Sequence, residues 1–314
     1  MGGIDIRETL VVGTRGSDLA LKQTQYVAEK LQKKFPAVQI DIRVIRTKGD
    51  ILQDVALAKI GGKGVFVKEI EDALLKGEID LAVHSMKDVP ADFPAELEIG
   101  AMPEREDPRD VLISRDRKKI EELRRGARIG TGSLRRKCQM GNLLPDVIIV
   151  ALRGNLDTRI KKIERENLDG VILAAAGIRR MGWVDRVSQF IPVEVMLPCA
   201  GQGALGVEVR ARDEELREMI SFMDHAPTRR EILAERAFLK RLGGGCQFPV
   251  AAYARGQGND IVLRGLVGNM DGSKMIMDEL KGPATEWERL GMEMAERILS
   301  YGGRAILAEF YAGH

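Results

Sequence analysis

The sequence contains few of the side chains that bind metals or form disulfides. Its 314 residues include only three cysteines and three histidines. Cys138, Cys199 and Cys246 are odd in number and far apart, so they do not suggest a disulfide framework. No pair of histidines has the spacing of a metal-binding motif, and we therefore expect no metal site.

Aromatic residues are also scarce, at 4% of the chain, and 49 Lys+Arg nearly balance 47 Asp+Glu. Nucleic-acid binders more often combine a strong basic excess with interleaved aromatics, so we expect no nucleic-acid partner. No apolar run approaches the ~20 residues that span a bilayer, and no apolar signal segment is found at the N-terminus. We expect a cytoplasmic monomer with free thiols and no membrane partner.

Strand-like apolar runs alternate with helical patterns over the first two thirds of the chain, which favours βαβ units and mainly parallel sheets. Residues 128–133, R-I-G-T-G-S, repeat the plan of residues 12–17, V-G-T-R-G-S, in which a serine opens a helix. Two α/β domains of similar plan are therefore expected. The predicted strands are residues 10–12, 39–46, 79–83, 147–152 and 171–176, and the predicted helices are residues 18–34 and 66–76.

The pattern changes after His225. A helical stretch over residues 227–242 precedes three strand-like runs, at 250–254, 261–267 and 274–280, and two further helices. This order predicts a small α+β domain with a three-stranded antiparallel sheet. Because 314 residues exceed one ordinary core, we expect two or three domains. The bounds that we predict for three are residues 1–103 plus 204–221, residues 109–197, and residues 225–314.

The segment G-Q-G-A-L-G at residues 201–206 matches the dinucleotide fingerprint G-x-G-x-x-G in its letters. That fingerprint needs a helix directly after the glycines, whose N-terminus holds the pyrophosphate. Residues 207–210, V-E-V-R, alternate like a strand instead. We interpret the segment as a hinge or crossover turn, and we expect no nucleotide phosphate site.

One cysteine lies in an unusual setting. Residues 242–250 are L-G-G-G-C-Q-F-P-V, so Cys246 follows three glycines between a charged helical stretch and a strand-like run. Glycine allows positive φ angles and close approach of another group to the backbone. A thiol presented in such a loop is open to covalent chemistry. The alternative is that Cys246 is a small buried hydrophobic residue, as lone cysteines often are.

Basic side chains recur in loops next to predicted strand ends, where doubly wound sheets line their ligand crevice. Arginine binds carboxylates or phosphates with a planar fork, and helix N-termini after Ser17 and Ser133 add backbone donors. We expect a cleft that binds a polyanion, although each cation alone could equally be a solvated surface charge. The set is Arg15, Lys59, Lys63, Lys87, Arg135, Arg136, Arg153, Arg159, Arg179 and Arg180.

Asp88 stands among these cations, in V-H-S-M-K-D-V-P at residues 83–90, just past a predicted buried strand. A carboxylate in this position can stabilise a developing positive charge or shuttle a proton. It could instead be a turn residue or a partner for Lys87, which spacing alone favours. His84 is expected to be a structural histidine at the strand end and not a catalyst.

Seven motifs together resemble the porphobilinogen deaminase family, also called hydroxymethylbilane synthases. The resemblance covers essentially the whole chain, and the motifs occur in the family's order. The usual T-S-S-L-R-R is T-G-S-L-R-R here, so Gly132 offers no hydroxyl where the family has a serine. The motifs are H-S-M-K-D-V-P (84–90), E-R-E-D-P-R-D (104–110), G-T-G-S-L-R-R (130–136), L-R-G-N (152–155), L-P-C-A-G-Q-G-A (197–204), A-E-R-A (234–237) and G-G-G-C-Q (243–247).

The resemblance implies two domains like the lobes of type II periplasmic binding proteins and a smaller third domain. It implies a transferase of tetrapyrrole (haem) biosynthesis that joins four porphobilinogen molecules head to tail with loss of ammonia. Water then releases linear hydroxymethylbilane. The resemblance also implies a dipyrromethane cofactor, attached to Cys246 by a thioether. Because every pyrrole carries an acetate and a propionate, a basic cleft suits the growing chain.

The resemblance further assigns roles to residues. Asp88 would face the pyrrole nitrogens, assist the departure of ammonia and stabilise the azafulvene cation. Residues 47–64 would form a mobile lid. The residues implied to bind the cofactor are Lys87, Asp88, Ser133, Arg135 and Arg136, with Cys246 as the attachment point. Those implied to bind substrate are Arg15, Ser17, Arg153, Arg159, Arg180, Gln202, Lys59, Lys63 and Phe66.

Two other functions fit parts of the pattern. A non-enzymatic binding or sensing protein of the same two-lobed fold would explain the basic cleft, but it would not explain the glycine-flanked Cys246. A hydrolase with a cysteine nucleophile would need a nearby histidine base. The chain has only three histidines, and one of them is the terminal residue.

Overall fold

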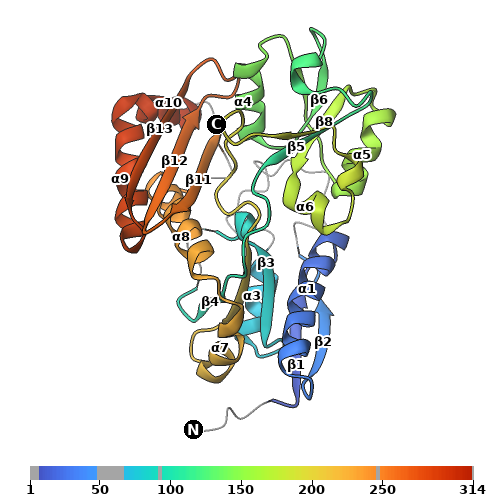
Figure 1. Ribbon diagram of the computed structural model, residues 1–314, viewed down its shortest axis with the longest axis vertical. Coiled ribbons are helices and arrows are strands. Elements are labelled where there is room, and N and C mark those ends of the chain that lie inside the picture. The colour runs from blue at the N-terminus through green and yellow to red at the C-terminus, as the bar shows by residue number, and fades with distance from the viewer. Residues whose placement is uncertain (1–6, 48–66, 91–93, 245–247, 313–314) are drawn as a thin grey trace. The chain divides into compact units, whose positions relative to one another are not determined.

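The computed structural model describes residues 7–47, 67–90, 94–244 and 248–312. Contacts divide the chain into two compact units, residues 1–106 with 204–229, and residues 107–203 with 230–314. The first unit holds one sheet and the second unit holds two (Figure 1). Each sheet has hydrophobic clusters of its own, and the division into three domains stays a prediction.

A five-stranded sheet forms the first unit. β1 (Thr9–Thr14) pairs in parallel with β2 (Gln39–Val44) and with β3 (Leu81–Ser85). β10 (Leu205–Arg210) returns from far along the chain and lies antiparallel between β3 and β4 (Leu97–Ala101). Four of the five strands therefore share one direction, which confirms the mainly parallel sheet. β10 also confirms that no helix follows the glycines of G-Q-G-A-L-G.

Apolar helix faces cover both sides of this sheet. α1 (Asp18–Lys34) and α7 (Glu214–Ile220) pack on one face, and α3 (Lys68–Leu75) packs on the other. β3 runs two residues beyond the predicted strand end because β10 pairs with it as far as Ser85. That partner strand lies in a distant part of the sequence, so no local pattern reveals the extension.

The second unit repeats this plan in its larger sheet. α4 (Leu134–Leu143) covers one face of that sheet, and α5 (Leu156–Arg165) and α6 (Ala175–Arg180) cover the other. The strands are β5 (Asp110–Ser114), β6 (Arg128–Gly130), β7 (Ile148–Val150), β8 (Gly170–Ala174) and β9 (Gln189–Ile191). Their order, β7-β6-β8-β5-β9, places β5 antiparallel between β8 and β9. This confirms two βα sheets of similar plan.

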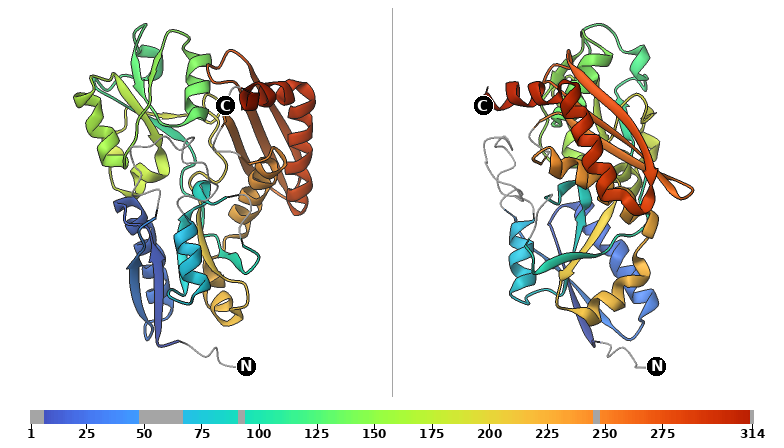
Figure 2. Two further views of the ribbon diagram at one scale, coloured as in Figure 1. Left: turned by 180° about the vertical axis from the view of Figure 1, so that it is seen from behind. Right: turned by 90° about the vertical axis from the view of Figure 1, so that its left-hand side faces the viewer.

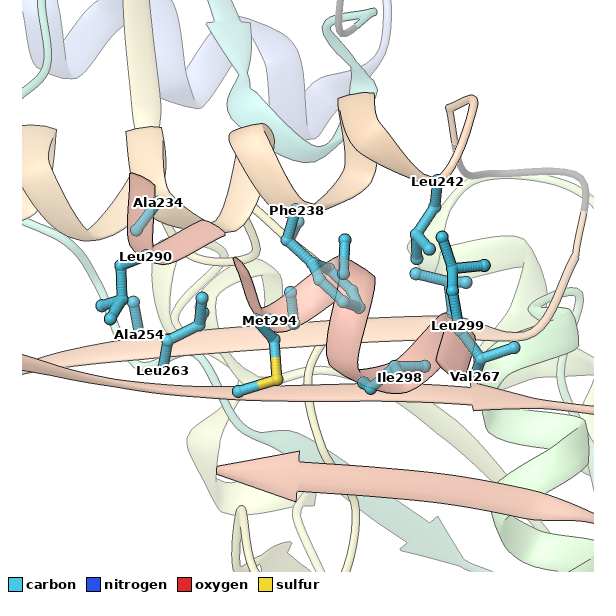
Figure 3. Packing of buried hydrophobic residues seen from close by; sticks show 14 of the residues in the cluster. Ala234, Phe238, Leu242, Ala254, Leu263, Val267, Leu290, Met294, Ile298 and Leu299 are labelled. Atoms are coloured by element: carbon cyan, nitrogen blue, oxygen red, sulfur yellow. The ribbon is translucent and has the colours of Figure 1, made fainter. Parts of the chain in front are cut away.

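The remaining sheet of the second unit is the predicted three-stranded antiparallel one. α8 (Ala226–Arg241) and α9 (Trp287–Ile298) pack against it, and α10 (Arg304–Ala312) follows at the end of the chain (Figure 2). Phe238 and Met294 meet between the two helices and the sheet, and both side chains are fully buried (Figure 3). The strands are β11 (Val250–Gln257), β12 (Asp260–Gly268) and β13 (Met275–Pro283).

No helix in the described part of the chain combines the length and the apolar character needed to cross a bilayer.

Candidate functional site

A small pocket opens in the first unit where β1 and β3 end, and its volume is about 50 Å³. A short 3-10 helix, η1 (Met86–Asp88), follows β3 directly and carries Asp88. Arg15 and Ser17 enter the same pocket from the turn between β1 and α1. The structure therefore brings together three residues that the sequence predicted to act at one site. The lining is Arg15, Ser17, Leu19, Ala20, Gln23, Val67, Val83, His84, Ser85 and Asp88.

Local capping positions the basic side of this pocket. Ser17 is the N-cap of α1, and its hydroxyl accepts a hydrogen bond from Ala20 N at 3.3 Å. The N-terminus of this 17-residue helix carries partial positive charge, and the Arg15 guanidinium adds a full one. Lys87 lies on η1 beside Asp88. This edge of the pocket thus favours a carboxylate ligand, while Asp88 itself is exposed to solvent.

The inner side of the pocket is polar and tightly bonded. Gln23 Nε2 donates to Ser85 Oγ at 2.9 Å, and His84 Nε2 lies 2.9 Å from Glu208 Oε2. His84 is therefore a bonded residue at the end of β3, as the sequence predicted. Sequence reasoning missed Gln23 and Glu208. The available signal for Glu208 was a carboxylate alternating with valines in V-E-V-R, where a buried strand needs a partner for it.

A second buried acid lies on the same side of the sheet as this pair. Glu71 of α3 is 9% exposed. Burial raises the pKa of the Glu71 carboxyl, and the charge of Glu208 raises it further, while His84 acts in the opposite direction. The pocket therefore lies against a group of titratable side chains that are shielded from water.

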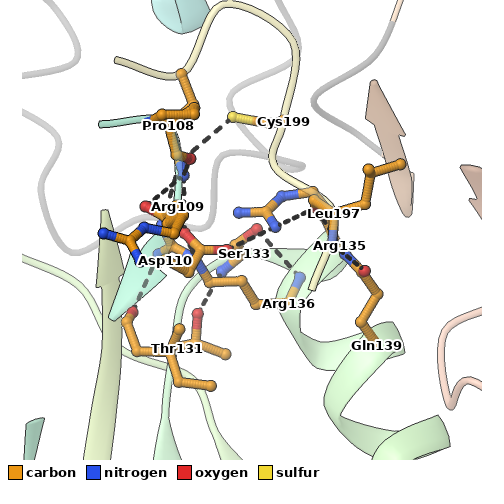
Figure 4. A network of polar contacts seen from close by, with 12 residues as sticks. Pro108, Arg109, Asp110, Thr131, Ser133, Arg135, Arg136, Gln139, Leu197 and Cys199 are labelled. Atoms are coloured by element: carbon orange, nitrogen blue, oxygen red, sulfur yellow. Dashed lines mark hydrogen bonds and ion pairs between the residues drawn. The ribbon is translucent and has the colours of Figure 1, made fainter. Parts of the chain in front are cut away.

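In the second unit, a buried ion network fixes the start of α4 (Figure 4). Asp110, at the beginning of β5, is fully buried. Its Oδ2 accepts from Arg135 Nη1 at 2.7 Å, and its Oδ1 accepts from Arg136 Nε at 3.0 Å and Nη2 at 2.7 Å. Burial alone would raise the pKa of Asp110, but the two guanidinium groups outweigh it and hold that pKa well below its ordinary value.

Backbone carbonyls complete this network. Arg135 Nη1 donates to Leu197 O at 2.7 Å, and Arg136 Nη1 donates to Ile172 O at 3.0 Å. Gln202 is fully buried, and its Nε2 donates to Asp110 Oδ1 at 2.9 Å. The residues that the resemblance assigned to ligands are thus engaged with the protein. Their direct ligand contacts stay predictions, and the contacts described here position the loops around them.

The presence of glycine at position 132 has a steric explanation. A Cβ atom at this position would lie 2.4 Å from Leu152 O, a backbone atom that cannot rotate away. Leu152 N in turn donates to Thr131 O at 3.3 Å. Glycine therefore lets the T-G-S turn approach the L-R-G-N loop, and with it the half-buried Arg153. Ser133 remains the N-cap of α4, and its hydroxyl accepts from Arg136 N at 3.4 Å.

Two further predicted arginines bond to loop carbonyls in this unit. Arg159 Nε donates to Gly154 O at 2.8 Å, and Arg180 Nη2 donates to Gly203 O at 2.7 Å. Arg179 pairs with Asp107 at 3.3 Å. The substrate contacts of Arg153, Arg159 and Arg180 stay predictions.

Several predicted site residues lie outside the described part of the chain: Lys59, Lys63, Phe66 and Cys246, together with residues 48–64 of the expected lid. The two described cysteines are both free, Cys138 buried and Cys199 partly exposed. Burial raises the pKa of the Cys138 thiol to about 12, with a smaller contribution from Asp271. Within the described ranges, no group of acidic, histidine and cysteine side chains is arranged to hold a metal ion.

Comparison with known proteins covers almost the whole chain. The family model "Porphobilinogen deaminase, dipyromethane cofactor binding domain" matches residues 10–218, and "Porphobilinogen deaminase, C-terminal domain" matches residues 229–300. A porphobilinogen deaminase of Syntrophus aciditrophicus is 56% identical over 302 residues, which are 96% of this chain and 99% of that protein. One of Geobacter metallireducens is 50% identical over 302 residues, 96% of this chain and 95% of that protein.

Solved structures offer a more distant likeness. The periplasmic aliphatic sulphonate binding protein SsuA from Escherichia coli aligns with 77% of this chain and 76% of its own, with 16% identity and a TM-score of 0.40. The sequence matches are far stronger, and they span both units. The chain belongs to the porphobilinogen deaminase family.

Proposed function

We propose that the pocket lined by Arg15, Ser17 and Asp88 carries the porphobilinogen deaminase reaction of this chain. The reaction joins four porphobilinogen molecules head to tail, releases one ammonia at each step, and ends with hydrolytic release of hydroxymethylbilane. The observation that carries the proposal is one pocket that holds an exposed carboxylate beside a guanidinium and a capped helix N-terminus. Porphobilinogen offers the matching charges, namely two carboxylates and one ammonium.

Asp88 acts on the positive charge of the substrate. The C–N bond of the aminomethyl group breaks, ammonia leaves with the electron pair, and the pyrrole is left with a delocalised positive charge. The Asp88 carboxylate stabilises this charge as it develops. Arg15 and the N-terminus of α1 hold the acetate and propionate side chains, so that the carbon that loses ammonia faces the next pyrrole.

The donor set fits a dipyrromethane cofactor, whose pyrroles also carry carboxylates. In the second unit, two guanidinium groups share the single carboxylate of Asp110, which leaves one positive charge in excess. Arg135 Nε is buried with no nitrogen or oxygen acceptor in the described part of the chain. We propose that Ser133, Arg135, Arg136 and Lys87 hold the cofactor, and that Cys246 is its attachment point. When bound, it supplies the pyrrole to which the first porphobilinogen is joined.

We also infer a cytoplasmic monomer that binds porphobilinogen and no nucleic acid. The balanced charge and the low aromatic content of the chain support this inference. Size-exclusion chromatography with light scattering tests the monomer, because a single species near 34.7 kDa is expected. A concentration-independent species of twice that mass would contradict it.

Intact-mass spectrometry tests the cofactor attachment. Wild-type protein should be heavier than its sequence mass by a two-pyrrole group. Cys246→Ser should lack this excess, whereas the matched control Cys199→Ser should keep it. An unmodified wild-type mass in active protein would refute the attachment.

Turnover of a second pair of variants tests the role of Asp88. Asp88→Asn should keep the added mass and the fold but lose at least about 100-fold in kcat, because a charge that stabilises the transition state is removed. The control Asp116→Asn changes a surface carboxylate with a 64% exposed side chain and should match wild type. If Asp88→Asn bound porphobilinogen and turned it over normally, the proposal for Asp88 would fail.

A further inference from the structure

A buried acid–base pair lies behind the Asp88 pocket and is not used in the steps above. His84 and Glu208 come from the adjacent antiparallel strands β3 and β10, in which Gly206 is the register partner of His84. His84 Nε2 lies 2.9 Å from Glu208 Oε2, and the two residues are 5% and 1% exposed. A carboxylate this deeply buried needs a partner, and the imidazole is that partner.

The imidazole connects this pair to the pocket. His84 is part of the lining, together with Ser85 and Asp88. In the described part of the chain, Glu208 is the hydrogen-bond partner of the ring through Nε2, and Nδ1 has none. A histidine in the lining of a pocket, with one ring nitrogen held by a carboxylate, is the arrangement of a histidine base and its orienting acid.

The condensation requires a base. When the new C–C bond forms, the attacking pyrrole carbon still bears its hydrogen, and that hydrogen must leave as a proton before the ring regains aromaticity. Ammonia has already departed with the electrons of the broken C–N bond. Each step therefore releases one proton in addition to one ammonia, and Asp88 is the group of the pocket that can receive that proton first.

We propose that the His84–Glu208 pair takes up this proton from Asp88 and passes it to solvent, which returns Asp88 to its charged form before the next step. The proton binds His84 Nδ1, and Glu208 stabilises the resulting imidazolium through Nε2. No bond other than N–H and O–H bonds changes, so the relay is balanced by the proton that the condensation supplies. The inference rests on the proposed function of the Asp88 pocket, and His84 acts through Asp88 as a positioning residue.

Other charged groups lie near the pair or line the same pocket. Glu71 and Lys68 come from α3, Arg15 comes from the turn before α1, and Asp88 comes from η1. Of these groups, Glu71 interacts electrostatically with both His84 and Glu208.

Steady-state kinetics of the cofactor-loaded enzyme across pH test the relay. His84→Gln keeps a donor that can bond to Glu208 but removes the nitrogen that accepts a proton. We expect it to keep the added mass and a KM within about 3-fold of wild type, while kcat falls roughly 10²-fold and its dependence on pH changes. Glu208→Gln should lower kcat in the same way, and Glu208→Asp should restore part of it.

Glu71→Gln is the matched control, because it removes a buried carboxylate near the pair without touching their hydrogen bond. Its kcat at the pH optimum should stay within about 3-fold of wild type. The relay is refuted if His84→Gln and Glu208→Gln keep the wild-type kcat and pH profile, even with a lower melting temperature. It is also refuted if Glu71→Gln lowers kcat as much as they do. Failure of the proposed function gives a different result, since Asp88→Asn would then remain active.

Discussion

Replacing Asp110 by asparagine tests the buried network of the second unit. In the folded protein one carboxylate pairs with two guanidinium groups whose side chains are 4% and 6% exposed. The amide of the asparagine could still accept a hydrogen bond, but it would leave both positive charges without a counter-charge. Breaking a buried ion pair by removing one partner costs about 3–5 kcal/mol. For a unit of this size, a loss of 1 kcal/mol lowers the melting temperature by about 2–4 °C, so we expect a decrease of roughly 6–20 °C.

Differential scanning calorimetry measures this decrease. The control Asp116→Asn removes an exposed carboxylate 3.8 Å from Lys118, and it should change stability by less than about 0.5 kcal/mol. An Asp110→Asn variant within 1 kcal/mol of wild type would show that the network contributes little, and would refute the reasoning.

The same network predicts a pH dependence. Folding holds the pKa of Asp110 below its unfolded value of about 3.9. The stabilisation is therefore complete above that pH, and it is lost as the pH falls toward the lower folded value. Urea unfolding between pH 7 and pH 3 should show a steeper loss of stability for wild type than for Asp110→Asn. Parallel curves for the two proteins would contradict this assignment.

Two further predictions concern the second unit. Iodoacetamide at pH 8 should label the partly exposed Cys199 in the native protein and spare Cys138. Burial and a pKa of about 12 keep the Cys138 thiol protonated. Peptide mass spectrometry measures the labelling, and equal labelling of the two cysteines would contradict this prediction. Gly141→Ala should lower the free energy of unfolding by about 1–3 kcal/mol or more, since the added Cβ would meet Asp271 O at 2.2 Å. Gly282→Ala, whose Cβ meets only the mobile end of the Leu290 side chain at 2.9 Å, should cost less in the same urea titration.

Features fixed by neighbouring residues could be predicted from the sequence. Ser17 and Ser133 were expected to open helices, and each is the N-cap of the helix that follows. The three strands near the C-terminus were found in the right order because each alternates locally and is separated from the next by turn residues. Asp88 could be singled out because its motif is contiguous; it lines the pocket with Arg15 and Ser17, and its catalytic role stays a prediction.

Features that depend on distant pairing could not be predicted. The bond between His84 and Glu208 joins two strands that are adjacent only in the folded sheet. Likewise, the sequence suggested that Arg135 and Arg136 face a ligand, and nothing local indicated that Asp110 lies between them. Composition shows that charges are present, but only the sheet order decides which of them neutralise one another.

The position of β10 determines when the first unit can complete its fold during synthesis. Its sheet needs Leu205–Arg210 beside β3, yet the polypeptide leaves the ribosome with β1, β2 and β3 long before that strand exists. Until residues 107–203 have also been synthesised, β3 has an open edge, and such an edge invites pairing with other nascent chains. A truncated product that stops before β10 should therefore be captured by chaperones or precipitate, whereas one that ends after Arg210 can complete the sheet.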